Sequence, residues 1–154
     1  MIKVRAYRQM FTDMLPSLTG ISSLHYVRTE EELSKKIKEL AEDELFLMVV
    51  IPSADSSSPD PDNISETDTC LLYCLKKVAR RNQDDEDFID DIETAQDAIT
   101  LVKEKLHEHA FNTNSPFFNL MHGLDLSRMH TDPEYDYFGC DGYSLSYYLK
   151  TNWY

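Results

Sequence analysis

The sequence is poor in cysteine and glycine, and this scarcity narrows the classes of protein to which it can belong. Its three cysteines, Cys70, Cys74 and Cys140, form an odd set, and neither a CxxC pair nor an HExxH helix is present. We therefore expect reduced thiols rather than a disulfide framework, and no structural metal site. Only four glycines occur and none belongs to a phosphate-cradling motif, so nucleotide hydrolysis is not expected.

Long apolar runs and an export signal are also missing. The longest apolar run, Leu45 to Ile51, is far shorter than the roughly 20 residues that cross a bilayer as a helix. The basic N-terminal stretch lacks a continuous apolar core followed by a small-residue cleavage site. We therefore predict a cytoplasmic protein without membrane association.

Positive charge is scarce: the chain has 15 Lys and Arg residues but 28 Asp and Glu residues, which gives a formal net charge of -13. This balance disfavours binding to nucleic-acid phosphates or anionic lipid, since both require clustered Lys and Arg. It favours a solvated acidic surface or a partner with a basic surface. The chain has 154 residues, 42% of them hydrophobic, which is enough for one core, so we predict a single domain over residues 1–154.

Apolar spacing predicts three helices. Apolar residues at three- and four-residue steps from Tyr7 to Leu15 indicate a short helix that ends at Pro16, and residues 2–6 are a candidate for an initial strand before it. Thr29 and Glu32 form a capping-box signature that begins a second helix. The third and longest, over residues 84–110, has one apolar stripe, an acidic start and a basic end, as the helix dipole favours.

The strands are predicted from apolar runs and alternation. Leu45 to Ile51 is continuously apolar and indicates a strand covered on both faces, and residues 69–78 alternate and should pair antiparallel with it. The Ser, Asp and Pro residues between them predict a long polar loop over residues 52–66. Further strands are expected at residues 24–27, 124–127 and 143–149, with turns at 132–133 and 139–142.

This order of elements predicts an α+β fold. We expect a mainly antiparallel sheet of about four to five strands. One long helix and one or two shorter helices should pack on one face of it.

No combination of residues predicts catalysis. His107 and His109 lie two positions apart on the long helix and therefore point to different sides, so they cannot chelate one ion unaided. Cys140 could act as a nucleophile supported by His122 or His130, but the adjacent Asp141 disfavours its thiolate. We therefore predict a protein that is not an enzyme, with no catalytic residues, no cofactor, no metal and no small-molecule substrate.

Aromatic residues crowd the C-terminal part of the chain more densely than a small sheet requires. Such residues are enriched at protein interfaces, although about half of them could instead fill the core. As candidate interface residues we select Tyr143, Tyr147, Tyr148 and Trp153. The whole cluster comprises Tyr135, Tyr137, Phe138, Tyr143, Tyr147, Tyr148, Trp153 and Tyr154.

From Leu45 to Thr151 the chain resembles the tail-terminator and tail-completion proteins, which join head and tail, of tailed bacteriophages and prophages. The resemblance rests on the apolar strand, the polar loop, the alternating TCLLYCLKKV strand, a long helix containing Thr94, Ala95 and Gln96, and the terminal GCDGYSLSYYLKT strand. The acidic start of the long helix departs from the family.

The resemblance implies a structural protein that forms a ring at the end of a phage-like tail or at its neck. Its partners would be copies of itself and neighbouring tail or neck proteins. An acidic channel wall would repel passing DNA and let it slide. The alternative is a small acidic cytoplasmic regulator or inhibitor that occupies a basic surface on another protein.

Overall fold

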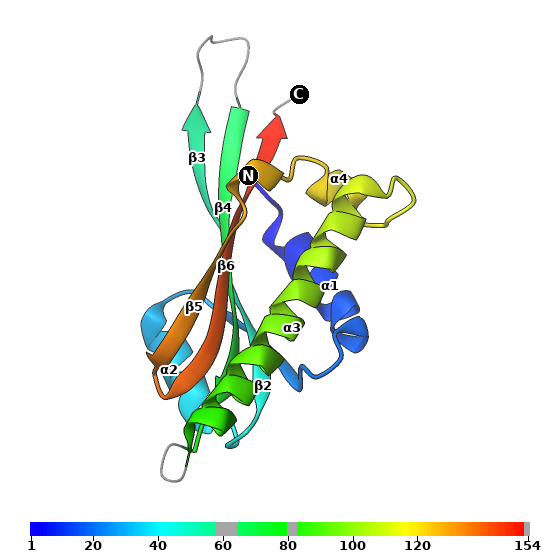
Figure 1. The fold of residues 1–154 in the computed structure, drawn as a ribbon. Coiled ribbons are helices and arrows are strands. Elements are labelled where there is room, and N and C mark those ends of the chain that lie inside the picture. Colours follow the sequence, from blue (N-terminus) through cyan, green and yellow to red (C-terminus); the bar gives the residue numbers. More distant parts are fainter. Residues whose placement is uncertain (58–64, 80–82, 153–154) are drawn as a thin grey trace.

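A mostly antiparallel sheet forms the centre of the molecule (Figure 1). The structure, a computed structural model, describes residues 1–57, 65–79 and 83–152. Strands run in the order β1-β2-β4-β6-β5, β3 pairs with β4 beside this path, and β1 and β2 are the parallel pair. The strands are β1 (Ser23–Val27), β2 (Leu45–Val50), β3 (Ser53–Ser57), β4 (Ser65–Lys77), β5 (His130–Tyr137) and β6 (Cys140–Asn152).

The predicted α+β class and the mainly antiparallel sheet are confirmed, but the sheet has six strands rather than four to five. The helices are α1 (Val4–Met14), α2 (Glu30–Glu39), α3 (Asp85–Phe111) and the single turn α4 (Phe118–Met121). The strand considered for residues 2–6 does not form. Helix α1 begins at Val4 instead, because Tyr7, Met10, Phe11 and Met14 make one buried stripe at helical spacing.

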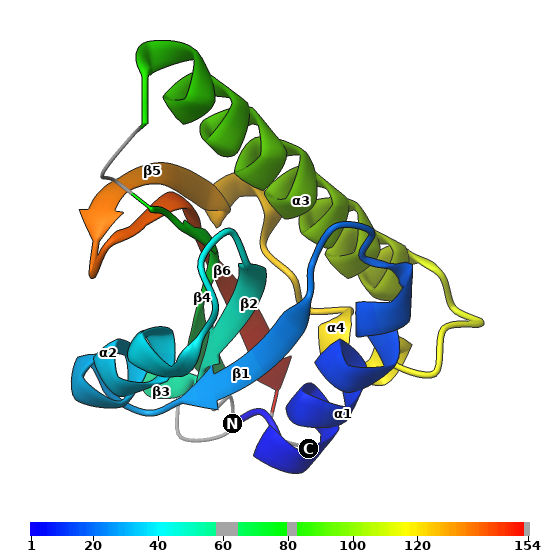
Figure 2. The ribbon, with the colours of Figure 1, turned by 90° about the horizontal axis from the view of Figure 1, so that it is seen from below.

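Two apolar clusters lie on opposite faces of the sheet. Helices α1, α3 and α4 contribute to the larger one, whereas Leu33 and Ile37 of α2 pack with Phe46 and Met48 on the other face. Figure 2 shows α2 on the far side of the sheet from α1 and α3. The expectation that all helices cover one face is therefore wrong. Alternate residues of β2 are buried on each face, so both faces need cover.

The segment predicted as a polar loop over residues 52–66 is partly a strand. Residues Ser53–Ser57 form β3, and β4 begins at Ser65, so both ends of the expected loop are paired. The prediction was wrong there because backbone hydrogen bonds, which do not depend on apolar side chains, hold this edge strand. The middle of the predicted loop, residues 58–64, lies outside the described residues.

The strand expected over residues 124–127 is also not formed. Leu124 makes one isolated bridge to Leu149, and Leu126–Arg128 is a 3-10 turn. The strand in this part of the chain is β5, which begins only at His130. It contains Asp132 and Pro133, which the sequence analysis predicted to form a turn. Because β5 pairs with β6 and forms an edge of the sheet, the missing amide hydrogen of Pro133 can face away from the ladder.

Strand β4 is the longest-paired element of the sheet. Its whole length pairs with β6, its second half pairs with β2, and its first half pairs with β3. Ile51 and Pro52 interrupt the line from β2 to β3, and the Ile51 amide donates to the Val27 carbonyl at 3.0 Å. As a result, β3 and the adjoining ends of β4 and β6 project beyond the helices as a three-stranded arm (Figure 1).

Candidate interaction surfaces

Tyr147, one of the predicted interface residues, lies in the core. Its side chain is fully buried, and its hydroxyl meets that of Tyr7 at 2.5 Å. Burial raises the pKa of both phenols well above the usual value, and the Cys70 thiol lies within hydrogen-bonding reach of both. Tyr147 thus cannot present a surface to another molecule, and the prediction for this residue is wrong.

The other predicted interface residues have different surroundings. Tyr143 is half-buried against the larger apolar cluster. Tyr148 lies on the opposite face of β6, where the guanidinium of Arg128 covers its ring at 3.6 Å from the centroid. Both aromatic rings are therefore largely used within the subunit. Trp153 lies outside the described residues.

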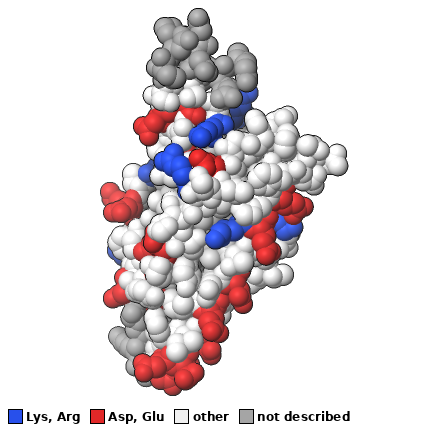
Figure 3. All heavy atoms as spheres, turned by 45° about the horizontal axis from the view of Figure 1, so that its top comes forward, with Lys and Arg blue, Asp and Glu red and all other residues white. Residues whose placement is uncertain are grey.

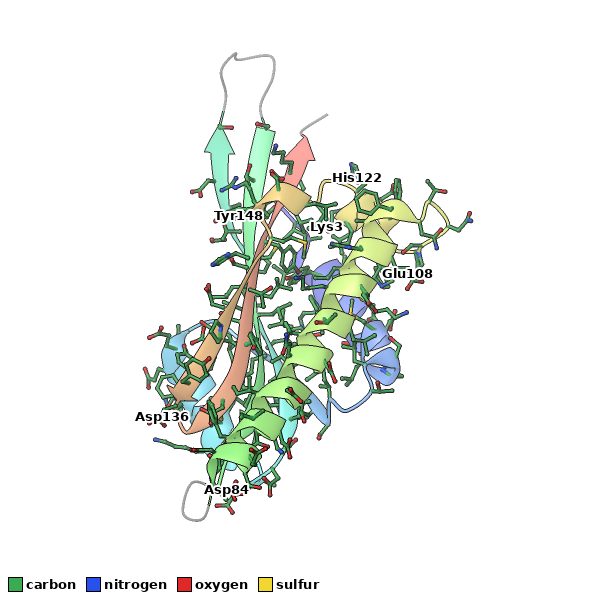
Figure 4. The ribbon with its side chains drawn as sticks, in the orientation of Figure 1. Lys3, Asp84, Glu108, His122, Asp136 and Tyr148 are labelled. Atoms are coloured by element: carbon green, nitrogen blue, oxygen red, sulfur yellow. The ribbon has the colours of Figure 1, made fainter. Side chains whose placement is uncertain are left out.

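The three cysteines are buried. Burial raises the pKa of the Cys70 and Cys74 thiols to about 12, so neither is a thiolate at neutral pH. Cys140, considered as a nucleophile, begins β6 close to Asp136, whereas His122 lies at the opposite end of the molecule (Figure 4). His130 is exposed, and its Nε2 lies 2.9 Å from Oδ1 of Asp132.

Within the described part of the chain, no three His, Cys, Asp or Glu side chains are placed to hold a metal ion. No helix among those residues is long and apolar enough to cross a membrane.

An aromatic tip, which we define as Tyr135, Tyr137 and Phe138, occupies the end of β5 and the turn that leads into β6. Tyr135 is 59% exposed and Phe138 is 45% exposed. The tip is fixed by neighbours, because Tyr135 packs against Phe88 of α3 and Tyr137 stacks on Tyr73 at 5.2 Å. Phe138 adopts φ 53, a left-handed conformation that is uncommon for a bulky residue. The turn thus holds an apolar ring in solvent at the cost of backbone strain.

An acidic stripe runs along the solvent face of α3. Its members recur every three or four residues, so they lie in one row about 16 Å long. All of them are exposed, and no ion pair among the described residues includes one. Figure 3 shows the acidic side chains following this helix from the lower end of the molecule. The stripe consists of Glu86, Asp90, Glu93 and Asp97.

Helix α1 carries the opposite charge. Its basic face, which we define as Lys3, Arg5 and Arg8, is exposed and has no carboxylate partner among the described residues. Arg8 lies over the ring of Tyr26, at 4.7 Å from the centroid. Arg5 and Arg8 border an open hollow of about 250 Å³, lined also by Val4, Gln9 and Thr12.

The basic face was missed at the sequence level, although a signal was present. In a chain with net charge -13, the first twelve residues contain three basic side chains and no acidic one. The acidic start of α3 was found, and its interpretation as a match to the helix dipole agrees with the capping box that Asp84 and Asp87 form.

Buried carboxylates anchor the chain just before α1. Asp68 is fully buried and accepts hydrogen bonds from the Ile2 amide at 3.0 Å to each of its carboxylate oxygens. Thr151 donates to the same carboxylate at 3.3 Å, and the Met1 amine contacts Glu66. These contacts fix the start of α1, and with it the basic face, to the base of the arm.

No protein-family model matches this chain, and no curated protein sequence matches it significantly.

Proposed function

We propose that the protein is a non-enzymatic structural subunit that forms a ring of the tail-terminator or neck type. The ring would cap or join a phage-like tail in the cytoplasm of a bacterial host, where the particle is assembled. Its partners are other copies of the chain and the adjoining tail or neck proteins.

The observation that carries this proposal is the aromatic tip. A free monomer gains nothing from exposing Tyr135 and Phe138, whereas aromatic anchors of this kind supply much of the binding energy at protein interfaces. The tip is also well fixed, because Phe88 and the Tyr73–Tyr137 stack hold its base. A fixed anchor loses little side-chain entropy when it binds.

The projecting arm supports the same function. A ring subunit needs one surface for each neighbour and a further surface for the tail, and the arm and the tip lie at opposite ends of the molecule (Figure 1). The outer edge of β3 carries Asp55 at its centre, which disfavours edge-to-edge pairing of two copies at this strand. The arm is thus better suited to contact a different protein.

The test compares oligomer formation by wild-type protein with that of a variant in which the aromatic tip is substituted. We expect wild-type protein to form a closed oligomer in sedimentation and negative-stain electron microscopy as its concentration is raised. The variant Tyr135→Ser/Phe138→Asn, in which Asn tolerates the left-handed backbone, should lose the oligomer or its binding to the tail protein encoded nearby. Phe111→Ser is the matched control, since Phe111 is 63% exposed but lies at the other end of α3.

A strict monomer at every concentration, with no binding to tail or neck proteins encoded beside it, would overturn the proposal. The second candidate, an acidic regulator or inhibitor, is favoured by the unpaired acidic stripe, which could occupy a basic groove of another protein. In that case the gene would lie beside one for a nuclease or another basic protein. The isolated pair would then form a complex that weakens steeply with salt.

A further inference from the structure

Two helices of this subunit carry exposed charge of opposite sign that forms no ion pair among the described residues. The basic face of α1 and the acidic stripe of α3 are joined by no ion pair in the described ranges. We propose that the basic face of one copy binds the acidic stripe of a second copy, head to tail. This inference rests on the proposed ring and identifies the contact between neighbouring subunits.

The start of α1 is built to bind an anion. Lys3 and Arg5 lie at the N-terminal end of α1, where the helix dipole is positive, so their charges repel the helix that carries them. A bound anion would be stabilised by the dipole and by the side chains together. The carboxylate of Asp68 is not the anion that Lys3 and Arg5 would bind. It is buried and already accepts hydrogen bonds from the Ile2 amide and the Thr151 hydroxyl.

The spacing of the two rows of charge matches. Arg5 and Arg8 are one helical turn apart, and so are successive members of the acidic stripe, which places neighbours about 5–6 Å apart in both rows. A guanidinium can bind a carboxylate through two parallel hydrogen bonds, so each arginine can contact one or two members of the stripe. Two helices laid side by side would bring these groups together.

The hollow beside Arg5 and Arg8 fits a macromolecular surface better than a small molecule. Its volume of about 250 Å³ is open to solvent, and small-molecule pockets usually enclose about 300–1,000 Å³. A neighbouring helix can instead lie across the hollow and cover Val4, Gln9 and Thr12, which line it. The occupant therefore belongs to another protein chain.

No ion pair joins the two surfaces within the described part of one molecule. Figure 4 places Lys3 near the upper end of the subunit and Asp84, at the start of α3, at the lower end. A contact between different surfaces of identical copies is heterologous, so each added copy leaves one surface free for the next. Such a series closes into a ring when the rotation between neighbours divides the circle.

Salt should act on this contact in two opposite ways. Two copies with net charge -13 repel each other over distances that a Debye length of about 30 Å at 0.01 M does not screen. At about 0.15 M the Debye length falls to about 8 Å, which screens the long-range repulsion but leaves ion pairs in contact partly intact. Association should therefore be strongest at intermediate ionic strength and weaker at both extremes.

Charge reversal tests the contact. Arg5→Glu/Arg8→Glu makes the basic face acidic, and Asp90→Lys/Glu93→Lys makes the acidic stripe basic, so each variant alone should associate at least tenfold more weakly than wild type. An equimolar mixture should regain assembly, because each surface again meets one of opposite charge. Lys35→Glu/Lys38→Glu, on exposed positions of α2, changes the net charge as much as the first variant and should keep wild-type assembly. Sedimentation velocity measures association, and melting temperatures check the fold.

Separate outcomes bear on the contact and on the function. If wild type assembles and both reversal variants assemble equally well, the contact is wrong while the ring stands. If the mixture regains association but forms open chains that bind no tail protein, the contact stands and the proposed function fails. Binding of duplex DNA to wild type that is lost in Arg5→Glu/Arg8→Glu, without any self-association, would assign the basic face to nucleic acid instead.

Discussion

The hydroxyl groups of Tyr7 and Tyr147 meet at 2.5 Å in the buried core, which links α1 to β6 across 140 residues of sequence. Either single substitution to Phe leaves a buried hydroxyl without this partner, so we expect each to destabilise the fold by about 1–2 kcal/mol. The double variant removes both polar groups and should cost less than the sum. Urea unfolding of the four proteins gives the coupling energy. Strict additivity would show that the contact contributes nothing specific.

The burial of the thiols predicts slow modification. At pH 8 a disulfide reagent should react with Cys70, Cys74 and Cys140 only as fast as the fold opens, because all three are buried and the pKa of Cys70 and Cys74 is raised to about 12. In denaturant all three should react at once. A thiol that reacts rapidly in the native protein would contradict the burial described above.

Gly142, within β6, and Gly139, just before it, should respond differently to substitution by alanine. A Cβ at Gly142 would lie 2.2 Å from the carbonyl oxygen of Cys74, so Gly142→Ala must displace the β4–β6 ladder and should cost about 3 kcal/mol or more. Gly139 has φ +81 with no atom within 4 Å of its Cβ position, so Gly139→Ala should cost only about 1 kcal/mol. Thermal unfolding of both variants checks the order, and equal losses would show that the ladder can shift freely.

Stability should fall as His109 becomes charged. Burial lowers the pKa of His109, which bonds Ser115 at 2.7 Å, and Lys105 lowers it further while Glu108 raises it. The folded pKa of His109 is below the unfolded value of about 6.5. The stabilising contribution of the neutral ring is therefore complete above pH 6.5 and is lost as the pH falls below that value and through the folded pKa. Urea midpoints of wild type and His109→Gln at several pH values should converge toward acid. A difference that does not change with pH would refute the shift.

The elements that were predicted correctly have strong side-chain patterns. The long helix, its acidic cap and the apolar strand β2 follow from periodicity, because burial of their side chains largely determines their conformation. Strands β3 and β5 were missed because they lie at the edges of the sheet. Their polar residues and Pro133 give no apolar alternation, and pairing of the backbone with β4 and β6 holds them.

The error at Tyr147 could have been avoided. It alternates with Leu145 and Leu149 on one face of β6, and Tyr148 alternates with Ser146 and Lys150 on the other, so the pattern already indicated which tyrosine faces the core. The basic face of α1 is a different case. The sequence shows its charge, but only the fold shows that no carboxylate in the described part of the chain forms an ion pair with Arg5 or Arg8.

The central position of β4 has a consequence for biosynthesis. Its partner β6 is synthesised only after α3 and β5, and the 13 residues of β4 cannot complete their ladder until β6 has left the ribosome. The contact between Tyr7 of α1 and Tyr147 of β6 likewise cannot form before β6 is synthesised. Until then β4 carries an unpaired edge with Cys70, Leu72 and Cys74 on the side destined for the core. Until β6 emerges, the nascent chain therefore exposes an extended apolar edge of the kind that chaperones bind.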